Sequence, residues 1–339
     1  MAAATAPAVP GRASGLVFAL AASAAFGTSG AFVKPLLDAG WTPAAAVAVR
    51  AAAGGLVLLV PALIALRGRF GLLARSWLFI VLYGLIAVIG AQVFYFAAIE
   101  RMPIGVALLI EYTAPVLLVL LAWARTRIPP ALLTVAGAVL SVAGLALVIN
   151  PSGAAGLDAL GLVFALLAAV CLAGYYIIAA MPTGELPPVT VVSAGLVVGG
   201  VFLGLLGAVG VVPFAMSFDD VVLPMAGEVP WWVPMGVVVV VATAAAYLLS
   251  LLGAVRLGSR VASFVGLVEV LFAVLFAWLL LGQVPTWLQG LGGVLIVGGV
   301  VLVKLQKEPA AGGTAAGLDE VELEPLPATG AIAVERRSR

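Results

Sequence analysis

The stretch "GLVFAL" occurs twice in this chain, at Gly15–Leu20 and again at Gly161–Leu166. Each copy opens an apolar run that continues into a stretch of small residues. If the copies mark the starts of duplicated units, the chain consists of two related halves. The number of helices in each half then decides how the halves are oriented.

The composition identifies the solvent in which the chain folds. Hydrophobic residues make up 64% of the 339 residues and charged residues 9%, whereas soluble domains carry about 25% charged residues. Apolar runs recur along the whole chain, and many approach the ~20 residues that a helix needs to cross a bilayer. We therefore expect an all-α polytopic membrane protein embedded in a lipid bilayer.

The same composition argues against several classes of function. The formal net charge of +1, without a basic stripe, argues against a nucleic-acid partner. Histidine is absent and Cys171 is the only cysteine, so the usual ligands of zinc and haem are almost missing. We expect no metal site and no cofactor.

Charged residues and Pro/Gly-bearing breaks divide the chain into ten apolar segments. They lie near residues 15–33, 43–66, 77–98, 103–124, 130–149, 158–180, 188–210, 231–253, 258–281 and 285–304. We expect ten transmembrane helices over these segments. Residues 1–14 form a short N-terminal segment, and residues 305–339 are too poor in apolar residues to fold alone, which predicts a disordered tail.

The distribution of Lys and Arg predicts the orientation. The side of the N-terminus carries ten basic residues: Arg12, Arg67, Arg69, Arg75, Arg125, Arg127, Arg256, Arg260, Lys304 and Lys307. The opposite side carries only Lys34 and Arg101. Both termini are therefore expected in the cytoplasm. Arginine outnumbers lysine 13 to 3, as in GC-rich bacterial genomes, so the expected location is a bacterial plasma membrane.

A second alignment of the chain with itself supports the duplication. A shift of 155 positions places Arg101 on Arg256, and 16 of the 48 positions from Arg101 to Val148 are then identical. The matches include Trp123 with Trp278, Pro130 with Pro285, Gly137 with Gly292 and Gly144 with Gly299.

The predicted repeats are residues 15–150 and 151–304, with five helices each. An odd number of crossings threads the second repeat upside down, which is a common plan of transporters. We expect a central cavity between the halves.

The closing pattern "FAWLLLGQVPTWLQGLGGVLIVGGVVLV" (Phe276–Val303) resembles EamA-type permeases of the drug/metabolite transporter superfamily. The stretch Val93–Leu121 is similar to the threonine/homoserine exporter branch, through "PIG" at Pro103–Gly105 and "EYTAP" at Glu111–Pro115. The resemblance implies a ten-helix transporter of a small metabolite. One departure is Val270 after Glu269, where EamA repeats usually carry proline.

Ionisable residues inside the hydrocarbon are costly, so they are candidates for function. Three lie well inside predicted spans: Arg50, Glu111 and Glu269. Pro115 removes the helical partner of the Glu111 carbonyl, which opens the helix beside a carboxyl group. Either acid could bind and release a proton. Arg50 could anchor a substrate carboxylate, or it could simply pair with one glutamate.

Polar neighbours form a second group of candidates for lining the cavity. Gln92 and Tyr95 share one face of the third span, and Tyr247 and Ser250 occupy the equivalent positions of the eighth under the shift of 155. Tyr112, beside Glu111, and Tyr175 on the sixth span complete the set, although tyrosine also packs as an ordinary apolar body.

These patterns favour a secondary-active transporter, an exporter of a small polar metabolite such as an amino acid, working by alternating access with protons as a candidate coupling ion. The nucleotide-binding pattern G-x-x-x-x-G-K-[ST] is absent, which argues against transport driven by its own ATP hydrolysis. Two alternatives remain at this stage. A lipid-modifying membrane enzyme lacks the expected cluster of Asp, His or Ser, so we expect no enzyme, and a membrane scaffold or sensor lacks an output domain.

Overall fold

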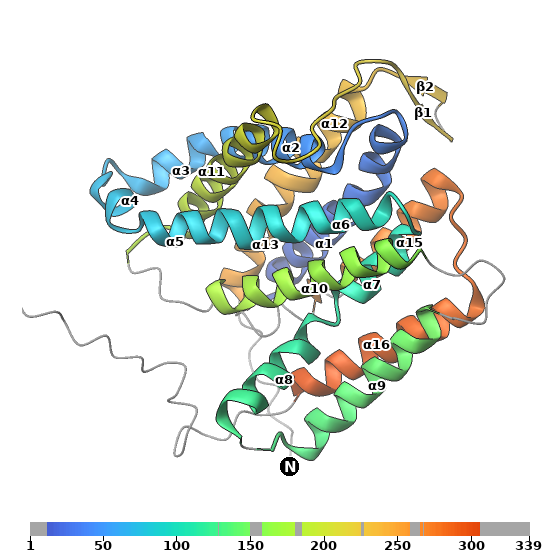
Figure 1. Ribbon diagram of the computed structural model, residues 1–339. Helices are drawn as coiled ribbons and strands as arrows, with labels where there is room; N and C mark the ends of the chain where they lie inside the picture. The colour runs from blue at the N-terminus through green and yellow to red at the C-terminus, as the bar shows by residue number, and fades with distance from the viewer. Residues whose placement is uncertain are drawn as a thin grey trace, which may run out of the picture.

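The structure is a computed structural model that describes residues 12–127, 129–149, 158–179, 185–224, 227–257, 265–266 and 268–305. Helices dominate these residues and pack side by side in a bundle (Figure 1). The predicted disordered tail beyond residue 305 and most of the predicted N-terminal segment lie outside the described residues.

The first half contains five helical crossings, three of which are built from several pieces. The pieces are α1 (Arg12–Asp38), α2 (Pro43–Val57), α3 (Leu59–Leu66), α4 (Gly71–Arg75), α5 (Trp77–Leu82), η1 (Tyr83–Gly90), α6 (Ala91–Ile99), α7 (Ile104–Glu111), α8 (Ala114–Thr126) and α9 (Leu132–Ile149). Helices α2 and α3 form one bent crossing with an angle of 46°. Helix α4 is a short turn between crossings, whereas η1 is a π-helical segment that joins α5 to α6.

The second half follows the same order of crossings. Its pieces are α10 (Ala159–Ala179), α11 (Pro188–Ala208), β1 (Val221–Leu223), β2 (Gly227–Val229), α12 (Trp232–Val239), η2 (Val240–Ala245), α13 (Ala246–Leu257), α15 (Val268–Leu281) and α16 (Trp287–Leu305). The two strands form a small antiparallel hairpin in which Val221 pairs with Val229. The ten spans predicted from the sequence include no strand here, because strands of three residues leave too short a pattern to recognise.

The described helices agree with the ten predicted spans. Five segments have the length and hydropathy to cross a membrane: Ser14–Asp38, Trp77–Ile99, Ile104–Arg125, Pro188–Ala208 and Trp232–Ser250. The bent pair α2–α3 makes a sixth. Four shorter apolar helices complete the set, over Leu132–Leu147, Ala159–Tyr175, Val268–Leu281 and Trp287–Leu302.

The packing of α9 against α16 reveals the symmetry of the two halves. A Cβ on Gly144 would lie 2.6 Å from the carbonyl oxygen of Gly292, and a Cβ on Gly299 would likewise collide with the carbonyl oxygen of Gly137. These two contacts exchange when each residue is replaced by its equivalent 155 positions away. The numbering rises along one helix as it falls along the other, so the equivalent helices are antiparallel. The halves are therefore inverted repeats.

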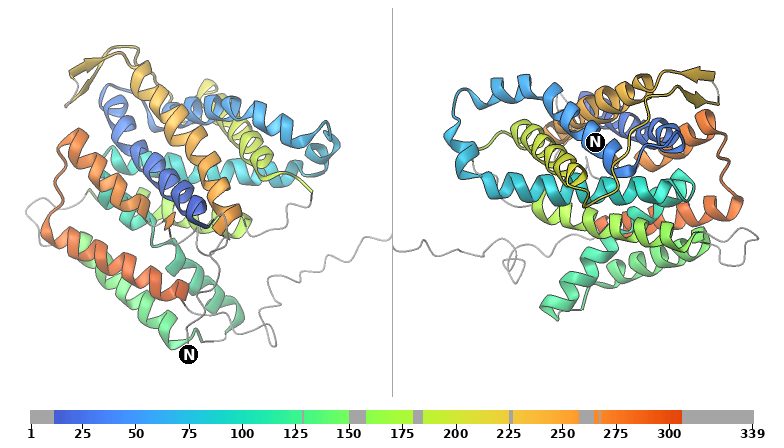
Figure 2. Two further views of the ribbon diagram at one scale, coloured as in Figure 1. Left: turned by 180° about the vertical axis from the view of Figure 1, so that it is seen from behind. Right: turned by 45° about the horizontal axis from the view of Figure 1, so that its top comes forward.

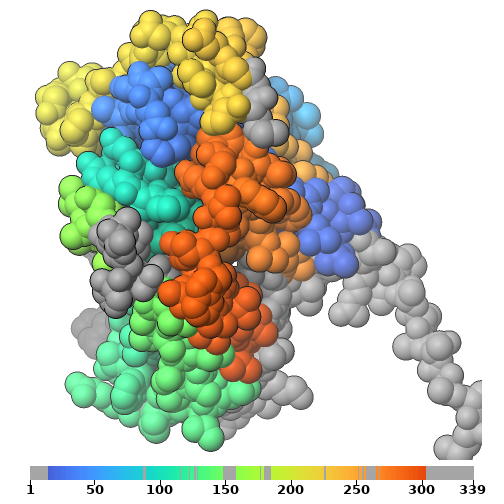
Figure 3. Space-filling view, turned by 90° about the vertical axis from the view of Figure 1, so that its right-hand side faces the viewer, coloured from blue at the N-terminus to red at the C-terminus, as the bar shows by residue number. Residues whose placement is uncertain are grey.

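The two faces of the bundle are defined by contacts between loops. On one face, the Trp41 indole Nε1 donates to the carbonyl oxygen of Ser217 over 2.6 Å, which ties the α1–α2 loop to the segment before the hairpin. On the other, Arg69 and Glu185 form an ion pair of 3.0 Å. The left view of Figure 2 shows α9 and α16 side by side at one edge, and Figure 3 shows the hairpin segment at the opposite edge.

Both halves interrupt their third crossing with a π-helical segment. Shifted by 155 positions, η1 falls on residues 238–245, which contain η2. A π-helical turn widens the helix and changes the direction of its carbonyls, and such turns are frequent at functional sites. The equivalent positions indicate that the interruption belongs to the repeat itself.

Candidate functional site

Arg50 lies at the centre of a hydrogen-bonded cluster between the two halves. Its side chain belongs to α2, and the residue is 3% exposed. The guanidinium donates from Nε to Thr243 Oγ1 (2.8 Å) and from Nη2 to the Ala242 carbonyl (3.2 Å), both on η2. From Nη1 it donates to Ser29 Oγ on α1 (2.7 Å) and to Gln92 Oε1 on α6 (2.6 Å). The cluster thus joins three crossings of the first half to one of the second.

Small residues allow η2 to approach α2 closely enough for these bonds. A Cβ on Gly54 would lie 2.5 Å from Thr243 Cγ2, so only glycine leaves room for the threonine. Thr243 Oγ1 also donates to the Val238 carbonyl over 2.8 Å, five residues back along the chain. This i→i−5 contact fits the wider π-helical turn and orients the hydroxyl oxygen towards Arg50.

The two predicted acids occupy different environments. Glu111, at the end of α7, is 6% exposed, and its carboxyl forms no hydrogen bond or ion pair with any residue that the structure describes. Glu269 is half-buried in the first turn of α15, where the helix dipole favours a negative charge. It accepts a hydrogen bond of 2.8 Å from the Tyr112 hydroxyl.

The acids and Arg50 share one electrostatic environment without touching each other. The charge of Arg50 interacts through space with Glu111, Glu269, Tyr95 and Tyr247. Among the described residues, however, every ion pair within 4.0 Å involves other side chains. The alternative in which Arg50 simply pairs with a glutamate therefore fails: its hydrogen-bond partners are all uncharged.

The remaining predicted residues are three tyrosines that pack against other side chains or helices, and one exposed serine. Tyr95 is 5% exposed and places its hydroxyl oxygen 2.8 Å from where a Cβ on Gly30 would lie. The Tyr247 ring packs edge-on against Phe26, with 5.0 Å between centroids. Tyr175 packs against Tyr83 instead, at 6.1 Å. Ser250 is exposed on α13, outside the Arg50 cluster.

Sequence reasoning missed three partners of Arg50. Ser29 and Thr243 are uncharged residues in apolar helices, where such residues are common and carry no strong signal. Phe96 places its ring 5.5 Å from the guanidinium carbon, a distance within the range of cation–π attraction. The only available clue was the spacing of four residues between Phe96 and Gln92, which puts both on one helix face.

The repeated "GLVFAL" stretches supply a second pair of contacts between the halves. The Arg101 guanidinium lies 5.3 Å from the ring centroid of Phe164, in the second copy of the stretch. The Arg256 guanidinium lies 4.7 Å from the ring centroid of Phe18, in the first copy. Each arginine also donates from Nη1 to the carbonyl four residues back, at 3.2 Å in both cases.

These two arginine–phenylalanine pairs are symmetry equivalents. Arg101 and Arg256 are related by the shift of 155 positions, and Phe18 and Phe164 by the shift of 146. Each pair joins the third crossing of one half to the first crossing of the other. Because the repeats are inverted, the pairs lie at opposite ends of the bundle.

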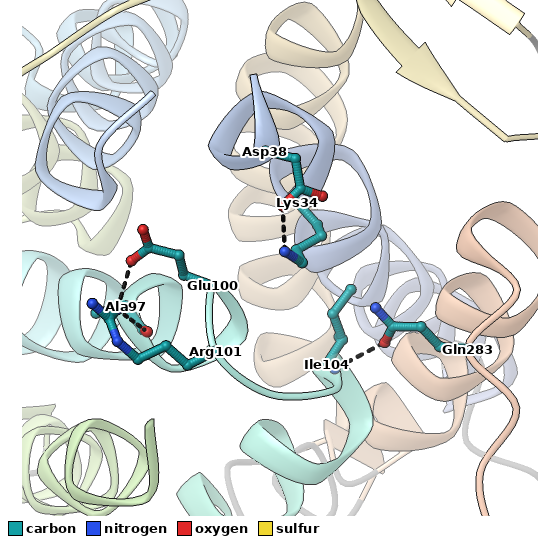
Figure 4. Close-up of polar contacts among 7 residues, drawn as sticks. All are labelled: Lys34, Asp38, Ala97, Glu100, Arg101, Ile104 and Gln283. Carbon is teal, nitrogen blue, oxygen red and sulfur yellow. Dashed lines mark hydrogen bonds and ion pairs between the residues drawn. The ribbon is translucent and has the colours of Figure 1, made fainter. Parts of the chain in front are cut away.

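The end that carries Arg101 holds further polar contacts, drawn in Figure 4. Glu100 accepts a hydrogen bond of 2.6 Å from Arg101, and Lys34 pairs with Asp38 along α1. The Gln283 side chain, between α15 and α16, accepts from the backbone N–H of Ile104 over 3.0 Å, where α7 begins. This bond caps α7 and joins the two halves at the same end.

Comparison with known proteins agrees with this architecture. No curated protein matches the chain significantly. Solved structures do: one crystal structure of a protein has a TM-score of 0.56 and 21% sequence identity, and the match covers 86% of this chain and 97% of that one. At this identity the likeness shows the fold alone.

A family model gives the more specific result. The model of the EamA-like transporter family matches residues 13–150 and 159–305, one match over each half. Together the matches cover most of the chain, including Arg50, both acids and both arginine–phenylalanine pairs. The chain belongs to the EamA-like transporter family.

Proposed function

We propose that this membrane transporter exports a small polar metabolite, such as an amino acid, by secondary-active alternating access. The observation that carries the proposal is the buried cluster around Arg50, between the inverted halves, with buried Glu111 and half-buried Glu269 nearby. Ionisable groups at such a depth are costly, and in transporters they mark the path of the substrate or of the coupling ion.

The two arginine–phenylalanine pairs support alternation between the faces. In alternating access the halves rock against each other, and contacts at one end break as those at the other end form. Arg101–Phe164 and Arg256–Phe18 join the halves at opposite ends. The structure holds both contacts at once, which suits an occluded state between the two open ones.

The two acids support coupling to protons. Glu111 lacks a hydrogen-bond partner among the described residues, and Glu269 is held by a single tyrosine hydroxyl. Neither acid is neutralised by a direct ion pair with Arg50, so either could gain a proton in one state and lose it in the other. In this scheme an inward proton flux drives export, with both termini in the cytoplasm.

The two halves are proposed to move as the units predicted from the sequence, residues 15–150 and 151–304. Within the described part of the chain, the bonds from Arg50 to Thr243 and to the Ala242 carbonyl join the two halves. Its bonds to Ser29 and Gln92 join helices of the first half. Hydrogen bonds to hydroxyl and amide groups rearrange more easily than a buried ion pair, since breaking one leaves no unpaired charge on the partner.

The test is counter-transport in proteoliposomes loaded with an isotope-labelled metabolite extract, with release followed by mass spectrometry. We expect a defined subset of metabolites to leave faster than from liposomes that hold the same extract but lack the protein. An opposing proton gradient should accelerate the release of these metabolites. Glu111→Gln and Glu269→Gln, singly and together, should abolish the acceleration. Release no faster than from the protein-free liposomes would exclude transport. Release that responds to the gradient in all variants would exclude coupling through these acids.

A further inference from the structure

Arg50 is a buried cation that no anion neutralises by direct contact within the described residues. All four of its hydrogen-bond acceptors are uncharged: two hydroxyls, one side-chain amide and one backbone carbonyl. They satisfy four donors of the guanidinium but leave its charge in place. A buried charge of this kind costs several kcal/mol, and the chain bears that cost although two acids lie within electrostatic reach.

The acids are held away from Arg50 by the structure itself. The Tyr112 hydroxyl, in the turn between α7 and α8, donates a hydrogen bond of 2.8 Å to the Glu269 carboxyl and fixes its position. Glu111, although 94% buried, makes no hydrogen bond with a described residue. The arrangement thus keeps one cation and one unpartnered acid apart in the same interior, and an anionic group of an added ligand would neutralise the cation.

The geometry of the guanidinium favours a carboxylate as that anionic group. Its planar fork offers parallel N–H donors that match the two oxygens of a carboxylate. Ser29 and Gln92 both accept from Nη1, and both are side chains that can rotate aside. The fork for a carboxylate is then one N–H of Nη1 together with the second N–H of Nη2, the one guanidinium donor of five that has no acceptor among the described residues. Thr243 and the Ala242 carbonyl would meanwhile hold Nε and Nη2 in place from η2.

We infer that the transported metabolite carries a carboxylate and that Arg50 binds it after displacing Ser29 and Gln92. The inference rests on the proposed transport function and narrows its substrate class. Amines without a carboxylate, and amides of the same compounds, are excluded as good substrates. Arg50 is then the residue that distinguishes an acid from its uncharged analogue.

The test compares matched sets of compounds on the purified full-length protein in detergent. Each proteinogenic amino acid is paired with its carboxamide and its decarboxylated amine, and the shift in melting temperature is measured for each. We expect stabilisation by one or more acids and none by their matched amides and amines. An amide or amine that stabilises as strongly as its acid would overturn the inference, as would a panel in which no acid stabilises.

Variants at Arg50 separate charge from geometry. Arg50→Lys keeps the positive charge but loses the fork, and should weaken binding of the stabilising acid roughly tenfold to a hundredfold, the range for hydrogen bonds to charged groups. Ser193→Ala is the matched control. It removes a buried hydrogen bond of 2.8 Å from Ser193 on α11 to the Gly55 carbonyl on α2, the helix that carries Arg50, and leaves the bonds of Arg50 in place. Equal affinity of Arg50→Lys and wild type would overturn the inference.

A further variant keeps the test valid if Arg50 variants fail to fold. Ser29→Ala removes an acceptor that the carboxylate must displace, so it should bind the acid about fivefold more tightly, given ~1 kcal/mol for one neutral hydrogen bond. Weaker binding would contradict the displacement. The proteoliposome assay distinguishes the two proposals: release of amines alone leaves transport standing and refutes the carboxylate, whereas no release refutes transport.

Discussion

Phe18 of the first half lies under the guanidinium of Arg256 of the second half, 4.7 Å from ring centroid to guanidinium carbon. The equivalent pair at the other end, Phe164 with Arg101, is separated by 5.3 Å. The six-letter stretch that repeats in the sequence thus provides, in each half, an aromatic ring for an arginine of the opposite half. This relationship explains why the stretch is repeated: it lies at a symmetric interface.

Breaking one of these pairs should favour opening at its own end. Phe164→Leu keeps an apolar side chain but removes the ring, and a cation–π contact contributes about 0.5–2 kcal/mol. We expect the ratio of the population open at the Arg101 end to the closed population to rise about twofold to thirtyfold. Cys171, the only cysteine in the sequence, is the reporter, because it is half-buried and packs against Gly90.

The measurement is the rate at which an impermeant maleimide labels Cys171 from each face of oriented membranes. Phe164→Leu should raise the rate from the face that carries Arg101, and Phe18→Leu should raise it from the opposite face. Phe202→Leu, on the exposed surface of α11, is the control. If both Phe variants raised the labelling rate from the same face, the two pairs would not close opposite ends of the bundle.

The close contact of α9 and α16 predicts a strong dependence of stability on glycine. Gly144→Ala forces a methyl group to within 2.6 Å of the Gly292 carbonyl oxygen, and overpacking of this kind costs about 1–3 kcal/mol. Gly290→Ala, in α16, places its methyl group in open space. Thermal unfolding in detergent should therefore show a lower melting temperature for the first variant only. Equal melting temperatures would mean that α9 and α16 accommodate the added methyl group without loss of stability.

Thr243 should be essential for holding Arg50. Thr243→Val preserves the shape of the side chain but removes an acceptor for Arg50 Nε and the bond to the Val238 carbonyl. A buried donor left unsatisfied costs about 1–3 kcal/mol, so the melting temperature should fall. Thr243→Ser should restore much of the loss, and Ser250→Ala, at an exposed position, should change nothing. Failure of serine to restore stability would show that packing against Gly54, rather than the hydroxyl, matters.

The sequence was sufficient for the helices and for their symmetry. Apolar runs gave ten crossings because each run must span the same thickness of hydrocarbon. Coincident Trp, Pro and Gly residues under one shift then indicated duplicated units. The equivalence of Gly144 with Gly299, and of Gly137 with Gly292, was readable from the letters. That these glycines face one another across α9 and α16 was not, since a shift does not specify which helices touch.

The site was only partly predictable. Arg50, Glu111 and Glu269 stand out because a charge in hydrocarbon is costly, but charge alone does not reveal partners. Arg101 and Arg256 lie near helix ends, where arginine usually extends towards the membrane surface, so their aromatic partners required the packing of both halves. The π-helical segments depend on one extra residue within a turn, a feature that apolar periodicity does not record.

The hydrogen bond from Tyr112 to Glu269 gives the sharpest single-atom test of the acids. Tyr112→Phe removes only the hydroxyl that holds the Glu269 carboxyl at 2.8 Å. A hydrogen bond to a charged group contributes about 1.5–3 kcal/mol, so proton-driven release from proteoliposomes should slow about tenfold or more. The amount of folded protein in the membrane should stay the same.

Tyr83→Phe is the matched control for this prediction. The Tyr83 ring is 5% exposed and stacks near Phe79 at 6.5 Å, so loss of its hydroxyl leaves the packing and the acids unchanged. Release is measured with and without an imposed proton gradient for both variants. If Tyr112→Phe slows only the gradient-driven part, the hydroxyl acts by positioning the acid for proton exchange. If both variants slow equally in both conditions, the tyrosines matter through packing, and the role assigned to Glu269 is wrong.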